Sequence, residues 1–208
     1  MRILYIDTSS SYLYAGISED EKLLCEVKKE FGHSLSEEAL PEIVSMFTEK
    51  NLTAKDIDKI IVVDGPGSFT GIRIGITIAK VYAWSLNIPI TTITSLEAMM
   101  LSSNENKVRV PMIDARRKYV FSAIYDENNR QILKPQHIKI DDLKQELEKL
   151  TDYVVITNDD IEDFENIESY DPDIIKIINY YKDKEAINPH AVNPDYLKLT
   201  EAEESKLN

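Results

Sequence analysis

Cysteine and histidine are scarce in this 208-residue chain, and the few present form no reactive or metal-binding pattern. Cys25 is the only cysteine, which excludes an internal disulfide and a cysteine-rich zinc site. The histidines, His33, His137 and His190, lie far apart, and none has a His-x-x-x-His or His-Glu-x-x-His spacing. No serine has the Gly-x-Ser-x-Gly context of a hydrolase nucleophile. We therefore expect no catalytic residue, no metal and no cofactor.

Long apolar runs and positive charge are also lacking. No stretch approaches the roughly 18 apolar residues of a membrane span, and the N-terminus MRILYIDTSS has no signal region, so we expect a cytoplasmic protein without membrane contact. Lys and Arg total 24 against 37 Asp and Glu, for a net charge of −13. This balance disfavours nucleic-acid binding as the main role, although a local basic patch stays open. The 43% hydrophobic content is enough for a globular core.

Strand and helix patterns alternate along the first half of the chain. Short apolar runs rich in β-formers predict strands, and apolar residues at helical spacing predict amphipathic helices. The expected strands span residues 3–6, 12–17, 23–27, 58–63 and 88–93, and the expected helices span 36–50, 71–86 and a segment starting near residue 96.

A polar break, SSNENK at residues 102–107, predicts a boundary between an N-terminal subdomain, 1–104, and a smaller C-terminal one, 105–208. Beyond it the patterns are weaker. They predict a helix over 141–150, a strand over 153–157, a helix or strand over 173–181, and an extended polar tail over 191–208.

Two segments match each other without a gap, residues 6–19 and residues 113–126. Each reads as an apolar strand ending in Asp (Asp7 and Asp114), a polar turn, a second strand led by Tyr, and an acidic reverse turn. Internal duplication is one interpretation, and two ordinary hairpins that agree by chance are the other. Duplicated halves of this kind predict an α/β fold of the actin-like ATPase (ASKHA, RNase H-like) class, with a complete N-terminal half and a reduced C-terminal half.

The stretch VVDGPGSFTGIRIG, residues 62–75, leads from a strand into a helix through three glycines. It is not a Walker loop, because no lysine occurs until Lys80. It is not a Rossmann fingerprint either, because three residues separate Gly67 from Gly71. Weak anion binding at the helix N-terminus and a purely structural turn both stay open.

Small residues recur at intervals of four along the helix that follows, at Gly71, Gly75, Ala79 and Ala83. They form a strip on one helical face, and a Gly inside a helix costs up to about 1 kcal/mol relative to Ala, so Gly75 requires a close neighbour. That neighbour is either part of the same chain or a partner chain. The rest of the helix is apolar on almost every side, which indicates that other parts of the protein or a partner pack against most of its surface.

Several motifs together resemble the TsaB (YeaZ) family. They are IDTSS near the N-terminus, GPGSFTGIRIG, SLEAM at 95–99, DARR at 114–117 and, more loosely, PDYLK at 194–198. One position departs from the family pattern: Leu35 stands where the family has a histidine at the start of the first helix, and His33 lies two residues earlier. The neighbouring Arg116 and Arg117 fit an anion, a partner carboxylate or a solvated surface.

The resemblance implies a non-catalytic subunit of the bacterial machinery that makes N6-threonylcarbamoyladenosine (t6A) at adenosine 37 of tRNAs reading codons that begin with A. TsaB pairs with its catalytic paralogue TsaD through a helical bundle, the ATPase TsaE joins the pair, and TsaC supplies the activated threonylcarbamoyl group. Where TsaD has two metal-binding histidines, this chain has Ser95 and Met99, so metal-dependent transfer is not expected. Given the net charge, we expect tRNA to bind mainly through the partners.

The resemblance also implies two sites. A partner face on the helices 36–50 and 71–86 would bind TsaD, or a second copy of the chain when TsaD is absent. Its expected members are Leu40, Ile43, Phe47, Gly71, Ile72, Gly75, Ile76, Ala79 and Ala83. A vestigial nucleotide cleft would comprise Asp7, Thr8, Ser9, Gly65, Gly67 and Asp114.

Two other functions compete with a scaffold role. An ATP-binding phosphotransferase would use Asp7, the serine turn after it and the Gly65 to Gly71 loop. A peptidase would need a nucleophile or metal constellation that the sequence lacks.

Overall fold

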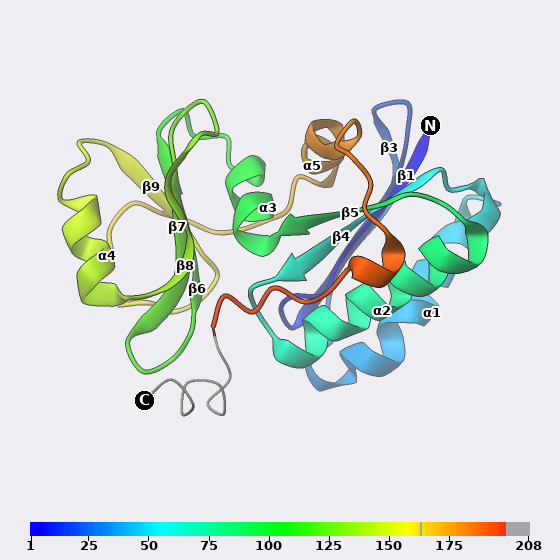
Figure 1. The fold of residues 1–208 in the computed structure, drawn as a ribbon, viewed down its shortest axis with the longest axis horizontal. Coiled ribbons are helices and arrows are strands. Elements are labelled where there is room, and N and C mark those ends of the chain that lie inside the picture. Colours follow the sequence, from blue (N-terminus) through cyan, green and yellow to red (C-terminus); the bar gives the residue numbers. More distant parts are fainter. Residues whose placement is uncertain (163, 199–208) are drawn as a thin grey trace.

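Two five-stranded mixed sheets lie side by side in the computed structural model, which describes residues 1–162 and 164–198 (Figure 1). The first sheet has the order β3-β2-β1-β4-β5 and the second β10-β9-β6-β7-β8. The strands of the first sheet are β1 (Arg2–Asp7), β2 (Tyr12–Glu19), β3 (Lys22–Glu30), β4 (Lys59–Gly65) and β5 (Ile90–Thr94). Those of the second sheet are β6 (Val108–Asp114), β7 (Tyr119–Tyr125), β8 (Gln131–Lys139), β9 (Tyr153–Ile156) and β10 (Ile167–Glu168).

Helices cover both outer faces of this pair of sheets and fill the space between them (Figure 1). The helices are α1 (Leu35–Glu49), α2 (Phe69–Leu86), α3 (Ser95–Ser102), α4 (Ile140–Leu147) and α5 (Ile174–Tyr181). The helices α1 and α2 cover the first sheet, α4 covers the second, and α3 and α5 lie between the sheets. Strand alternation divides the core accordingly: Leu4 and Ile6 of β1 pack under α1 and α2, while Ile3 and Tyr5 face α3 and α5.

The two sheets repeat one topology, which confirms the predicted duplicated α/β fold. In each half the first strand pairs antiparallel with the second and parallel with the fourth. The halves differ at one place, because α2 joins β4 to β5 whereas β9 reaches β10 without a helix in the described residues between them. The C-terminal half is therefore reduced by one helix.

Most expected elements are present, and the differences have local causes. The ambiguous segment 173–181 is a helix, α5, capped by the Asp173 side chain, which accepts from the backbone N–H of Lys176. The strand β8 was not expected, because its mixed polarity and Pro135 hide the alternation. No helix in the described ranges combines the length and apolarity that a bilayer crossing needs.

The chain returns to its first half near the C-terminus. The helix α5 packs against the first sheet, and the segment 187–197 crosses α2, where Val192 is only 1% exposed. The predicted extended tail is thus partly a packed segment, and residues 199–208 lie outside the described residues. The division at residue 104 stays a prediction.

Candidate functional site

A cleft of about 1060 Å³ lies between the two halves. Its walls come from the carboxyl ends of β1 and β6, the turn after each strand, the loop before α2 and the first residue of α3. Of the residues predicted to form a cleft, four line it: Asp7, Ser9, Gly67 and Asp114. Thr8 and Gly65 are not among its lining residues and contact other parts of the chain.

Asp7 and Asp114 occupy equivalent positions at the ends of β1 and β6. Each Oδ1 accepts a 2.8 Å hydrogen bond from the backbone N–H two residues later, Ser9 and Arg116 respectively. Asp7 is 2% exposed, and its burial raises the pKa of the carboxyl despite the hydrogen bonds from Ser9, which oppose the shift. Asp114 is exposed, and its backbone N–H donates to Oδ2 of Asp159 at 2.7 Å. The duplication therefore extends to the hydrogen bonds of the cleft.

The glycines before α2 are required by close contacts between backbone segments. Gly65 and Gly67 have φ values of +128° and +152°, which side-chain-bearing residues rarely adopt. A Cβ on Gly67 would overlap the carbonyl oxygen of Ser9, and a Cβ on Gly65 would overlap that of Asp195. Ser68 N–H also donates to the Ser9 carbonyl at 2.7 Å. This loop is thus held against the β1–β2 turn and the C-terminal segment.

Thr8 points away from the cleft, towards α2. Its Oγ1 donates to the carbonyl of Gly71 at 2.7 Å and accepts from the backbone N–H of Gly75 at 3.0 Å. A Cβ on Gly71 would overlap the Thr8 carbonyl oxygen, and one on Gly75 would overlap Thr8 Oγ1. The small-residue strip therefore packs α2 against its own sheet, which is the within-chain alternative left open by the sequence.

Most of the charged side chains that line the cleft are acidic. The carboxylates of Asp7, Glu30, Asp114 and Asp159 face it, and Arg116 is the cation among the lining residues. No three His, Cys, Asp or Glu side chains within residues 1–162 and 164–198 lie close enough together to hold a metal ion. These carboxylates outnumber the single lining cation, and like charge opposes the approach of a phosphate group.

Aromatic rings form one wall of the cleft, which sequence reasoning missed. Tyr12 and Tyr14 stack with ring centroids 5.3 Å apart, and Tyr170 meets Tyr14 edge-on at 5.8 Å. The two-residue spacing of Tyr12 and Tyr14 on a strand places both on one face, so their proximity could have been predicted from the sequence. Tyr170 lies far away in sequence, and nothing local marks it.

Eight of the nine residues predicted for the partner face are buried in the core of the chain. They are Ile43, Phe47, Gly71, Ile72, Gly75, Ile76, Ala79 and Ala83. In this structure the chain itself covers them, because apolar spacing identifies the covered face of a helix and not what covers it. Their contact with a partner stays a prediction. Leu40 is 45% exposed and remains available.

A different set of apolar side chains is open on the same two helices. Leu40 and Val44 are exposed on α1, Val81 is exposed on α2, and Ile74 and Ile78 are half-buried beside them; we refer to these five as the apolar ridge. The helices meet at Phe47 and Tyr82, whose rings are in edge contact at 6.3 Å. Leu40 and Val44 share a helical face with Phe47, and Ile74 and Ile78 share one with Tyr82, so the two rows adjoin.

The C-terminal segment covers the opposite flank of α2. Lys80 Nζ donates to the carbonyl of Val192 at 2.8 Å, and Arg73 Nε donates to the hydroxyl of Tyr196 at 2.7 Å. The Arg73 guanidinium also lies 3.8 Å from the ring centroid of Phe69, which stacks on Tyr196. One flank of α2 is thus occupied within the chain. Val81 lies at its margin and lines a hollow with Val192 and Tyr196, and the rest of the ridge lies towards α1.

Comparison with known proteins gives concordant matches. The family model described as "TsaD: tRNA N6-adenosine threonylcarbamoyltransferase" matches residues 29–162. The tRNA threonylcarbamoyladenosine biosynthesis protein TsaB of Bacillus subtilis is 32% identical over 98% of this chain and 96% of its own length. TsaB of Buchnera aphidicola (from Acyrthosiphon pisum) is 32% identical over 50% of this chain and 52% of its own. YeaZ of Pseudomonas aeruginosa superposes with a TM-score of 0.75 at 17% identity, covering 94% of this chain and 99% of that one.

Proposed function

The chain belongs to the TsaB (YeaZ) family of t6A biosynthesis, and on that premise we propose that it is a non-catalytic scaffold that binds TsaD. The pair, joined by TsaE, would carry out threonylcarbamoyl transfer to adenosine 37 of tRNAs that read codons beginning with A. The same face of the chain would close a homodimer when TsaD is absent.

The apolar ridge is the observation that carries this proposal. Three of its five side chains are exposed on adjoining helices, with Leu40 at 45% and Val81 at 58%. Exposed apolar side chains grouped in this way mark protein contact surfaces more often than singly scattered ones do. The TsaD-type domain supports a paralogous partner, because two related α/β halves can pair through corresponding helices in a helical bundle.

The cleft supports a non-catalytic role. Ser95 and Met99 lie on α3 where, from the family resemblance, TsaD has its metal-binding histidines, and neither side chain is a good ligand for a hard divalent cation. The acidic lining also disfavours a nucleotide phosphate. The chain would therefore contribute binding and organisation, and TsaD the transfer chemistry.

Co-expression with TsaD tests the scaffold proposal. The tagged chain should retain TsaD through size-exclusion chromatography, and light scattering should give the mass of a complex containing both. In reactions that also contain TsaC, TsaE and ATP, t6A should form with TsaD and the chain together and not with the chain in the absence of TsaD. Failure to retain TsaD at micromolar concentrations would refute the proposal.

A phosphotransferase of the actin-like class is the second candidate, favoured by the cleft and its paired Asp7 and Asp114. Calorimetry with ATP and magnesium on the isolated chain separates the two. Micromolar binding with measurable phosphate transfer would establish the enzymatic function, and absence of heat would support the scaffold.

A further inference from the structure

Three consecutive residues in the turn between β6 and β7 adopt a left-handed backbone conformation. Arg116, Arg117 and Lys118 have φ values of +64°, +53° and +63°. Such angles are uncommon for residues with side chains, and a run of three is costly. Ala115 N–H donates to the carbonyl of Tyr119 at 2.9 Å and Tyr119 N–H to that of Arg116 at 3.0 Å, so the turn is tightly closed. The three cations are therefore presented on a fixed support.

The equivalent turn of the first half shows that the duplicated hairpin does not require this conformation. Ser9, Ser10 and Ser11 occupy the corresponding positions after Asp7, and none of them has a positive φ. Both turns follow an Asp with the same hydrogen bond, as described above. The positive charge and the left-handed backbone thus belong to the second half alone.

Most cations of the described chain have an internal partner, and those of this turn do not. Lysines and arginines that form ion pairs or donate to backbone carbonyls include Arg2, Lys28, Lys29, Lys50, Lys59, Lys80, Lys107, Lys149, Lys176 and Lys182. Arg116, Arg117 and Lys118 are exposed and make no ion pair with a carboxylate in residues 1–162 and 164–198. Arg116 lines the acidic cleft, whereas Arg117 and Lys118 are not among its lining residues. In a protein of net charge −13, three adjacent cations without an ion pair are a local exception.

A fourth cation, Lys139, lies beside them. Tyr119 and Lys139 are cross-strand partners in β7 and β8, and Lys139 Nζ is 5.9 Å from the Tyr119 ring centroid. The other partner of the Tyr119 ring is His137, which stacks on it at 4.5 Å. Ile140 N–H donates to the carbonyl of Lys118 at 3.0 Å, which joins the turn to the end of β8.

Two acidic residues lie nearby in the sequence. Asp141 and Asp142 stand in the first turn of α4, where the helix N-terminus stabilises their negative charge.

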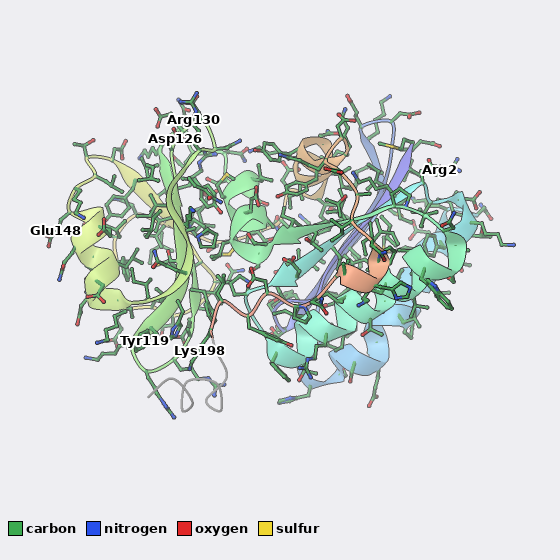
Figure 2. All side chains as sticks on the ribbon, in the orientation of Figure 1. Arg2, Tyr119, Asp126, Arg130, Glu148 and Lys198 are labelled. Atoms are coloured by element: carbon green, nitrogen blue, oxygen red, sulfur yellow. The ribbon has the colours of Figure 1, made fainter. Side chains whose placement is uncertain are left out.

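We propose that this group, Arg116, Arg117, Lys118 and Lys139, contacts the phosphodiester backbone of RNA. The inference rests on the proposed function, because under that function the complex binds tRNA, which is a polyanion. Cations on a fixed turn position a phosphate backbone without reading its sequence. The contact is therefore independent of anticodon and adds to binding by the partners. In Figure 2 Tyr119, the first residue of β7, and Lys198, the last described residue and also a cation, both lie near the lower edge of the view.

The test is tRNA affinity of the complex with TsaD, measured by fluorescence anisotropy across a salt series. The variant is the double substitution Arg117→Asn and Lys118→Asn, because Asn tolerates positive φ and the turn is kept. Affinity should fall about threefold to tenfold, and the slope of log K against log salt should lessen by about 1 to 2, since each phosphate contact contributes nearly one. The loss should be equal for a tRNA that does not read codons beginning with A.

A matched control carries the same change of charge elsewhere. Lys22→Asn with Lys55→Asn also removes two exposed cations, on the first half and far from the turn in sequence. This control should keep the wild-type affinity and slope. Equal affinity and slope for both double variants would overturn the inference, as would loss of TsaD or TsaE co-purification with tRNA affinity intact, which would make the turn a protein contact.

The outcome separates this inference from the proposed function. If the complex assembles and tRNA affinity is unchanged, the inference fails and the scaffold stands. If no complex with TsaD forms, the scaffold fails, and the titration is repeated with the chain alone at low salt. Binding there that the Asn variant weakens supports the RNA contact, and absence of binding overturns it.

Discussion

The backbone N–H of Gly75 donates to Thr8 Oγ1 at 3.0 Å, and a Cβ on Gly75 would overlap that same oxygen. Thr8 cannot move aside easily, because its hydroxyl also donates to the carbonyl of Gly71. Gly75→Ala should therefore destabilise the fold. Overpacking costs about 1–3 kcal/mol, against a gain of up to about 1 kcal/mol from helix propensity. Urea denaturation should show a net loss of stability.

Thr77→Ala is the control for that experiment, since Thr77 is exposed on the same helix. Its stability should stay within about 0.5 kcal/mol of the wild type. The result also decides which variants can report on partner binding. A large residue at Gly75 or Ala79 would disturb the chain itself, so loss of a partner there would not identify an interface. Unchanged stability of Gly75→Ala would contradict the packing described here.

Leu40→Asp combined with Val81→Asp should weaken TsaD binding and leave the fold intact. Both side chains are largely exposed, so a carboxylate costs little in the free chain, whereas an apolar interface would have to bury it. Affinity for TsaD should fall at least about tenfold, which corresponds to roughly 1.4 kcal/mol. Co-purification and calorimetry measure the effect, and circular dichroism checks the fold.

Ile132→Asp is the matched control for the ridge, because Ile132 is 53% exposed on β8 of the second sheet. TsaD binding should be unaffected by it. Equal losses for the ridge variant and this control would indicate general destabilisation. Wild-type affinity of the ridge variant would remove the interface from α1 and α2.

The duplication and most helices and strands of the first half could be predicted from the sequence, because both depend on local residue patterns. Asp7 and Asp114 end apolar strands in the same register, and the strip from Gly71 to Ala83 follows helical spacing. The neighbour of the strip, Thr8, could not be predicted from the sequence, since it is more than sixty residues away in the chain. The left-handed turn at Arg116 also left no local signal, because that conformation depends on closure between two strands.

Val192→Ala should lower stability, although Val192 lies outside every α-helix and β-strand, directly after a short 3-10 helix, Pro189–Ala191. Its side chain is buried in the core under α2, and removing two methyl groups costs about 1.6 kcal/mol before any cavity term. Asn193→Ala is the control, because Asn193 is exposed next to it. Equal stability of the two variants in urea would mean that the segment does not pack on α2 in solution.

Asp64 gives a prediction for the dependence of stability on pH. Burial raises the pKa of its carboxyl to about 7, the nearby Asp195 carboxylate adds to the rise, and a hydrogen bond with Thr92 opposes it. Oδ1 of Asp64 is buried and has no hydrogen-bond partner among the described residues. The folded chain therefore favours the neutral acid, while the unfolded chain ionises near the ordinary pKa of about 4.

Between about pH 4 and pH 7 the folded state keeps a proton on Asp64 that the unfolded state has lost. The free energy of unfolding should consequently fall as pH rises through this window, by no more than about 1.4 kcal/mol per pH unit from this group, and level off above pH 7. Asp64→Asn carries no ionisable group there, so its stability relative to the wild type should be more favourable at pH 8 than at pH 5. The raised pKa of the Asp7 carboxyl acts in both proteins, so their difference isolates Asp64. Urea denaturation from pH 5 to pH 8 measures it, with the exposed Asp160→Asn as control. A difference that does not change with pH would show that Asp64 is ionised throughout this range in the folded chain.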